Sequence, residues 1–163
     1  MIEYDSFQSQ VGSISILAVN EGTIKIAFEK ESKEEIDRWC WEKLSMRFQK
    51  GTKLTDGPKN KILSFLSGKI KYLDFPILHF NSPFYKKVLE AEKKIPYGKT
   101  KSYQEVANMI NHPKSVRAVG SANANNPLPI YFPCHRIINS NGNIGGYGGG
   151  IEIKRKLLHL EYL

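Results

Sequence analysis

The sequence predicts an α+β protein built from two small lobes, and three observations support this class. Through the first thirty residues, apolar side chains alternate with polar or small ones, which is the period of β-strands. From Lys33 onward most segments follow the helical period instead. Between the halves, Asn81-Ser82-Pro83 combines a helix-capping serine with a proline suited to the first helical position. We therefore expect an N-terminal α/β lobe over residues 1–80 and a mainly helical C-terminal lobe over residues 81–163.

The first lobe should begin with a hairpin that has one buried face. Two alternating runs flank the turn residues Asn20-Glu21-Gly22, with apolar positions at Ile14, Ile16, Ala18, Ile24, Ile26 and Phe28. A helix over residues 33–50 then places Cys40 and Phe48 on its apolar stripe, so Cys40 is expected in the core. Asp56-Gly57-Pro58 should break the chain before a short helix that ends at Gly68. We expect this lobe to act as support.

The second lobe should contain a helix-turn-helix. Ser102 can cap a helix that runs to Ile110, with Glu105 completing a capping box, and Ser115 can cap a second helix from Val116 to Ala124. After Arg117 the second helix is made almost entirely of small residues. Such a surface lets the backbone approach DNA closely, and Arg117 is the one long cation there that could enter a duplex. A helix packed tightly inside the protein would show the same small residues.

Charge and composition indicate which partners the protein binds and in which compartment it is found. The net charge is +8, and residues 81–163 carry +7 of it, since they hold 12 Lys/Arg and 5 Asp/Glu. That asymmetry favours a polyanionic partner, although general solubility is an alternative. The four histidines are scattered without zinc-type spacing, so no metal is expected. No apolar stretch approaches ~18 residues and two distant cysteines form no disulfide framework, so we expect a cytoplasmic, intracellular protein away from membranes.

Pro133-Cys134-His135-Arg136 is the most informative segment, because it places a thiol beside an imidazole and a guanidinium after an apolar run expected to be a strand. A free cysteine titrates near ~8.5, and a neighbouring base or cation raises the thiolate fraction at neutral pH. Cys134 is therefore a candidate nucleophile. An inert cysteine beside a structural histidine is the alternative.

Three flanking segments could complete a site around Cys134. Asn126 precedes the prolines Pro127 and Pro129 and lies eight residues before the thiol, where its amide could lock the loop or merely form a turn. The glycine-rich segment 142–150 lacks the ending of a phosphate-binding loop, so it could bring backbone amides to a flat ligand beside Tyr147, or simply be flexible. In a final helix over residues 151–163, Glu161 shares a face with apolar residues. A buried Glu161 would pair with His135 and favour its protonated form, whereas an exposed one would not.

Together these segments resemble the O6-alkylguanine-DNA alkyltransferases, also called methylated-DNA–protein-cysteine methyltransferases. The resemblance runs from about Phe84 to Glu161. It rests, in order, on Tyr97-Gly98-Lys99-Thr100, Ser102-Tyr103-Gln104-Glu105, Arg117-Ala118-Val119-Gly120, Asn126-Pro127-Leu128-Pro129, Pro133-Cys134-His135-Arg136, the Gly-Gly-Tyr-Gly-Gly-Gly loop and Glu161. The N-terminal lobe is similar only in its strand-then-helix pattern, which in this family is a ribonuclease-H-like fold. The zinc site of some members has no counterpart here.

The resemblance implies DNA repair by irreversible, single-turnover transfer of an alkyl group, such as methyl, from O6-alkylguanine to Cys134. The implied partner is double-stranded DNA containing alkylated guanine, the protein acts as a monomer, and no cofactor is required. Glu161, His135 and a water would relay the thiol proton, and Asn126 would hold the loop. Tyr103 would rotate the nucleotide and protonate the departing guanine.

The resemblance also implies a set of DNA and base contacts. Arg117 would fill the gap in the base stack, and Tyr147 would form a wall of the guanine pocket. The other implied contacts are Tyr103, Ser121, Arg136, Ile137 and Gly148, with carbonyls at Cys134 and Ile137 reading the base edge. Many relatives have serine where this chain has Gly148, so only its backbone amide is left to contact the guanine oxygen.

Three other functions fit the sequence less well. A non-catalytic alkyltransferase-like lesion binder usually has tryptophan in place of the acceptor cysteine, which Cys134 argues against. A helix-turn-helix regulator needs long polar side chains on its second helix, and these are missing. A cysteine hydrolase would turn over repeatedly and leave no lasting adduct.

Overall fold

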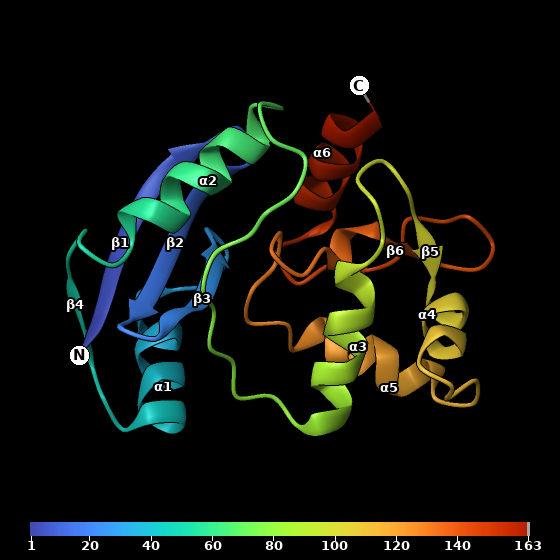
Figure 1. The fold of residues 1–163 in the computed structure, drawn as a ribbon, viewed down its shortest axis with the longest axis horizontal. Helices are drawn as coiled ribbons and strands as arrows, with labels where there is room; N and C mark the ends of the chain where they lie inside the picture. Colours follow the sequence, from blue (N-terminus) through green and yellow to red (C-terminus); the bar gives the residue numbers. More distant parts are fainter. Residues whose placement is uncertain (163) are drawn as a thin grey trace. The chain divides into compact units, whose positions relative to one another are not determined.

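The computed structural model describes residues 1–162, and the chain divides into two compact units, Met1–Phe80 and Asn81–Leu163 (Figure 1). The first unit contains a four-stranded sheet with strand order β3-β2-β1-β4. The strands are β1 (Ile2–Ser9), β2 (Gly12–Val19), β3 (Gly22–Phe28) and β4 (Phe48–Lys50). β1, β2 and β3 pair antiparallel in succession, whereas β4 pairs parallel to β1. The predicted hairpin is β2–β3, and it is one part of this larger sheet.

The two helices of the first unit cover opposite faces of its sheet. α1 (Lys33–Leu44) packs against the face that carries Ile2 and Tyr4. α2 (Asp56–Leu66) lies on the other face, where Lys59 pairs with Asp5 at 3.4 Å. Successive side chains of a strand point to opposite faces, so Tyr4 and Asp5 mark the two sides. The expectation of one buried face was therefore wrong, because β3 is buried along nearly its whole length.

The helix boundaries differ from the expected ones for local reasons. α1 ends at Leu44 because Ser45 adopts a left-handed conformation with φ 52, so Phe48 lies in β4 and not on the helix. α2 already begins at Asp56, and Pro58 occupies its first turn, where a missing backbone N–H removes no helical hydrogen bond. Cys40 is fully buried on α1, as predicted.

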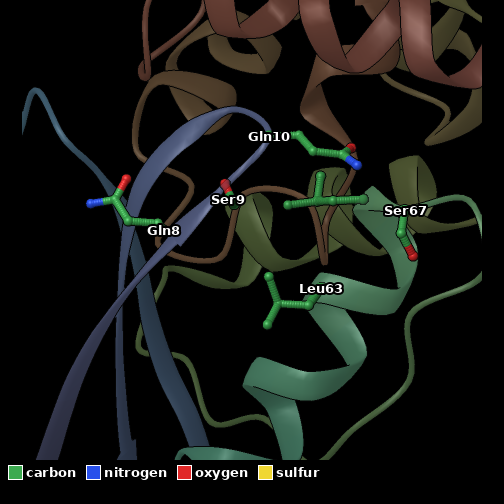
Figure 2. Close-up of a pocket in the computed structure, with 6 residues that line it drawn as sticks. Gln8, Ser9, Gln10, Leu63 and Ser67 are labelled. Carbon is green, nitrogen blue, oxygen red and sulfur yellow. The ribbon is translucent and has the colours of Figure 1, made fainter.

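A groove of about 430 Å³ lies in the first unit between the β1–β2 turn and the end of α2 (Figure 2). Its lining residues are Gln8, Ser9, Gln10, Leu63, Leu66 and Ser67. None of these six side chains is an acid, a base or a thiol. The hydroxyls of Ser9 and Ser67 therefore have no general base among the lining residues that could activate them.

The second unit is mainly helical. It contains α3 (Pro83–Lys93), α4 (Tyr103–Met109), α5 (Val116–Ala124) and α6 (Ile151–Tyr162), and the expected last position of α6, Leu163, lies outside the described residues. The core that joins α3, α4 and α5 comprises Val88, Ala91, Ile95, Val106, Ala107, Ile110, Val119, Ala122 and Ile137. A two-residue strand, β5 (Lys101–Ser102), pairs parallel with β6 (Ile137–Ile138).

The predicted helix caps are only partly formed. Ser82 and Ser102 each accept a backbone hydrogen bond, from Tyr85 at 3.3 Å and from Glu105 at 3.0 Å. The side chain of Glu105 pairs with Lys101 at 3.5 Å. Ser115 precedes α5 without making a side-chain capping bond. The boundaries of α5 are nevertheless the predicted ones.

No helix within residues 1–162 has the length and apolar content needed to cross a bilayer. Over the same residues, no group of three or more His, Cys, Asp or Glu side chains is arranged to hold a metal ion.

Candidate active site

The acceptor candidate Cys134 lies in a pocket of about 290 Å³ in the second unit. Cys134 begins the 3-10 turn η1 (Cys134–Arg136), where the sequence suggested a strand. The pocket is lined by Tyr103, Gly120, Asn123, Ala124, Cys134, Gly146, Tyr147 and Gly148. The small residues Gly120 and Ala124 on α5 leave room for a ligand, and the volume is close to the lower end for small-molecule sites. The thiol thus opens into a cavity walled by α5, the helix that carries Arg117.

The loop before Cys134 is tightly held. Phe132 N donates to Leu128 O over 2.9 Å, and Cys134 N donates to Phe132 O over 2.7 Å. Within this loop, Ile130 is buried and has φ 73, a conformation that a β-branched residue adopts only under constraint. Strain of this kind persists where surrounding contacts overdetermine the backbone. The thiol is therefore presented by a preorganised turn.

Asn126 connects the loop to the thiol. Its Nδ2 donates to Phe132 O over 3.0 Å and to Cys134 Sγ over 3.2 Å. Its Oδ1 accepts from Leu128 N over 2.9 Å. The sequence predicted an amide that locks the loop, and the direct contact with sulfur adds a donor that stabilises negative charge there.

Glu161 is the centre of a buried ionic cluster. Its Oε2 bonds His135 Nε2, and its Oε1 accepts from Arg136 Nε over 2.8 Å and from Gly98 N over 2.9 Å. Arg136 also donates through Nη1 to Ile95 O over 2.7 Å. Burial alone would raise the pKa of Glu161, but His135 and Arg136 together lower it to about 2. Glu161 is therefore a carboxylate across the physiological range.

His135 pairs with Glu161 as predicted, and this carboxylate favours the protonated imidazole. The ring is fully buried, and this burial lowers its pKa more strongly than the Glu161 carboxylate raises it. With Nε2–H directed to Glu161, Nδ1 is left as an acceptor, and it has no hydrogen-bond partner within residues 1–162. A neutral imidazole in this tautomer can accept a proton at Nδ1.

The resting thiol of Cys134 is protonated. Burial and the nearby Glu92 carboxyl raise its pKa to about 12, against the opposing effects of the Asn126 hydrogen bond and the Lys154 charge. The sequence suggested that His135 and Arg136 would favour thiolate. Neither residue is among the groups that shift the pKa of Cys134 in the free protein, and Arg136 is bound to Glu161.

Two ionisable groups near the thiol were missed from the sequence. Lys154 is fully buried and donates through Nζ to Ile137 O and, over 3.0 Å, to Gly146 O. Glu92 is fully buried as well. The helical period of the sequence indicated that both side chains are buried. Lys154 shares a helix face with Leu157 and Glu161. Glu92 lies on the same apolar face as Val88 and Leu89.

The other predicted site residues are placed in two groups. Tyr103, Tyr147 and Gly148 line the same pocket as Cys134. Arg117 and Ser121 are exposed on α5. Arg136 is not brought to the surface, because it is buried against Glu161, and the carbonyl of Ile137 already accepts from Lys154.

Comparisons with known proteins place this arrangement in a family. The family model described as "6-O-methylguanine DNA methyltransferase, DNA binding domain" matches residues 83–163. The chain is 35% identical over 158 residues to the methylated-DNA–protein-cysteine methyltransferase of Methanosarcina acetivorans, which covers 97% of each chain. This chain belongs to the methylated-DNA–protein-cysteine methyltransferase family. The family resemblance predicted from the sequence is thus confirmed.

Two further relatives agree with that membership. The inducible methylated-DNA–protein-cysteine methyltransferase of Bacillus subtilis is 38% identical over 151 residues, covering 90% of this chain and 82% of its own. The crystal structure of Mycobacterium tuberculosis OGT in complex with DNA is similar with a TM-score of 0.86 at 29% identity, over 98% of this chain and 92% of that one. The mixed α+β class predicted from the sequence is confirmed by this likeness.

Proposed function

We propose that this protein repairs DNA by a single, irreversible transfer of an alkyl group from O6-alkylguanine in double-stranded DNA to Cys134. The observation that carries the proposal is the Cys134 thiol in a cavity walled by the small residues of α5. Relatives named methylated-DNA–protein-cysteine methyltransferases and a relative solved in complex with DNA support it. The protein works as a monomer on DNA inside the cell, and it needs no cofactor.

The reaction is an in-line displacement at the alkyl carbon. The Sγ–C bond forms while the C–O6 bond breaks, and the electron pair of that bond passes to the guanine. Tyr103, which lines the pocket, donates the proton that neutralises the departing base. The product is a thioether, which offers water no easy leaving group, so each molecule reacts once.

The thiol proton leaves through His135. A water carries it from Cys134 to the Nδ1 acceptor of the neutral imidazole, and the Glu161 carboxylate stabilises the resulting cation through Nε2. Asn126 holds the loop and donates to the developing thiolate. Arg136 keeps Glu161 in place, and this replaces the DNA contact first expected of it.

The DNA-binding side consists of α4 and α5, which act as a helix-turn-helix. The target oxygen is inaccessible in stacked DNA, so the base is rotated out of the duplex at a cost of a few kcal/mol. Arg117, exposed at the start of α5, fills the gap, and Ser121 on the same helix contacts the backbone. Tyr147, the amide of Gly148 and the carbonyl of Cys134 receive the base, whereas the carbonyl of Ile137 is occupied by Lys154. The N-terminal unit, with a ribonuclease-H-like fold, supports this domain of residues 81–163.

The alternatives are less well supported. A lesion binder without transfer activity does not need a thiol facing its pocket, and Cys134 is one of the pocket walls. A regulator that reads base edges needs long polar side chains on its second helix, whereas α5 offers small ones apart from Arg117 and its asparagine.

The test is transfer of one methyl group. After incubation with a duplex containing one O6-methylguanine, peptide mass spectrometry should find a single methyl group on Cys134. Cys134→Ala should abolish the adduct and retain DNA binding, while Cys40→Ala, which changes the buried cysteine of the other unit, should still react. Turnover beyond one equivalent would exclude the proposal.

A further inference from the structure

Lys93 is the last residue of α3, and its side chain contacts the loop that carries the acceptor thiol. Its Nζ donates to Tyr131 O over 2.8 Å and lies 3.8 Å from the centroid of the Tyr131 ring. The two residues are 38 positions apart in the chain, so only folding brings them together. One half-buried cation therefore binds both the backbone and the side chain of a single loop residue.

Tyr131 occupies a critical position in that loop. It directly follows Ile130, whose φ of 73 marks the strained point of the backbone. It directly precedes the fully buried Phe132, and the two rings meet edge to face with their centroids 5.0 Å apart and their planes at 89°. A contact that fixes Tyr131 therefore acts on the strained residue before it and on the buried ring after it.

Two side chains hold successive peptide groups just before the thiol. Lys93 binds the carbonyl of Tyr131, and Asn126 Nδ2 binds the carbonyl of Phe132 over 3.0 Å. The same Phe132 carbonyl accepts from Cys134 N over 2.7 Å. Asn126 comes from the start of the loop itself, whereas Lys93 comes from α3. Lys93 thus ties the loop to a helix of the core.

The contact made by Lys93 is of a strong kind. A hydrogen bond from a charged donor is shorter and stronger than one between neutral groups, and an ammonium over an aromatic face gains further electrostatic attraction. A cation at the end of a helix also interacts favourably with the helix dipole. Lys94 follows at the same helix end and is exposed, so it shares the effect of the dipole. The hydrogen bond and the ring contact with Tyr131 distinguish Lys93.

We propose that Lys93 is a positioning residue for alkyl transfer: its ammonium fixes the peptide group and ring of Tyr131 and so holds the strained loop that directs the Cys134 thiol into the pocket. The inference rests on the proposed function, in which Cys134 is the alkyl acceptor. Lys93 is not among the residues that line the pocket, so it acts through the loop and not on the base.

The first test compares Lys93→Met, which keeps an unbranched side chain and removes the charge, with Lys93→Arg, which keeps a charged donor. At saturating O6-methylguanine duplex, the single-turnover rate of methyl transfer should fall about tenfold in Lys93→Met, because the charged hydrogen bond and the ring contact are lost together. Lys93→Arg should restore most of the rate. Lys94→Met is the matched control and should react like wild type. The DNA concentration that gives half the maximal rate should be unchanged in Lys93→Met.

The second test measures the loop directly. Amide hydrogen exchange of Phe132 and Cys134, whose N–H groups bond within the loop, should be about tenfold faster in Lys93→Met. The amide of Val119 in α5 should exchange as in wild type, which shows that the unit stays folded. Tyr131→Leu provides a second variant, because it removes the ring and keeps the carbonyl. It should slow transfer by a smaller factor, and adding Lys93→Met to it should cost less than in wild type.

The outcomes separate this inference from the proposed function. If wild-type protein accepts no methyl group from the duplex, the proposed function fails, and the exchange of the loop amides still shows whether Lys93 holds the loop. If wild-type transfer is normal, an unchanged rate in Lys93→Met overturns the inference alone. A loss that appears only as a higher half-saturating DNA concentration also overturns it, because Lys93 would then be a DNA contact.

Discussion

The side-chain amide of Asn126 bonds both the backbone that carries the acceptor and the acceptor itself, over 3.0 Å to Phe132 O and 3.2 Å to Cys134 Sγ. One residue therefore couples the shape of the loop to the charge on sulfur. Loss of the amide removes a donor to the thiolate and frees a strained segment that contains Ile130.

Asn126→Ala should therefore slow methyl transfer by about tenfold to a hundredfold and lower the free energy of unfolding by about 1–3 kcal/mol, because a buried acceptor loses its donor. Single-turnover kinetics and denaturant unfolding measure the two effects. Asn125→Ala is the matched control, since Asn125 is exposed and its side-chain amide donates to Ser121 O of α5. Equal effects of the two substitutions would contradict the role of Asn126.

Glu161 should make the free energy of unfolding depend on pH in the acid range. Its folded-state pKa of about 2 lies below the unfolded value near ~4.3, so its contribution is complete above the unfolded pKa and disappears as pH falls toward 2. The difference in unfolding free energy between wild type and Glu161→Gln should shrink by about 3 kcal/mol between about pH 5 and pH 2. Denaturant unfolding at several pH values measures it. Glu152→Gln, at an exposed position of α6, should show no such dependence, and a constant difference for Glu161→Gln would count against the buried carboxylate.

Arg117 should matter only when the base has to leave a duplex. Arg117→Ala should slow transfer from duplex DNA by about tenfold to a hundredfold, since a few kcal/mol of unstacking is no longer offset. Its rate with iodoacetamide should be unchanged, because Arg117 is exposed and is not among the residues that line the pocket. Arg155→Ala, which removes an exposed cation of α6, serves as the control. A parallel loss with both reagents would show that Arg117 acts on the thiol or on folding.

The glycine-rich loop should tolerate a side chain at one position and not at another. A Cβ at Gly148 meets no atom within 4 Å, so Gly148→Ser should fold normally and add a hydroxyl beside the pocket. We expect transfer to become a few-fold faster, by about 0.5–1.5 kcal/mol for one hydrogen bond to the guanine. At Gly145, φ is +75 and a Cβ would lie 3.3 Å from the Tyr103 hydroxyl. Gly145→Ser should therefore lower stability by about 1–2 kcal/mol and slow transfer, as thermal unfolding and single-turnover rates will show.

Much of the local structure could be predicted from short stretches of sequence. Ser82 before Pro83 and Ser102 before Tyr103 mark helix starts that the structure confirms, because a cap depends on residues within one turn. The pairing of the strands was harder to predict from the sequence. Only β2–β3 was defined by alternation around a turn, whereas the burial of both sheet faces depends on how α1 and α2 pack against the sheet.

The sequence by itself determined which residues are candidates for the site. Residue type and spacing identified the thiol of Cys134, the imidazole of His135, the carboxylate of Glu161 and the amide of Asn126. Tertiary structure alone decided their charge states. Burial raises the pKa of the thiol and lowers the pKa of the imidazole, Arg136 is turned inward, and Glu92 and Lys154 are fully buried. The physical reason is that desolvation and charge coupling depend on every atom within several ångströms, and those atoms come from α3, η1 and α6, which only folding brings together.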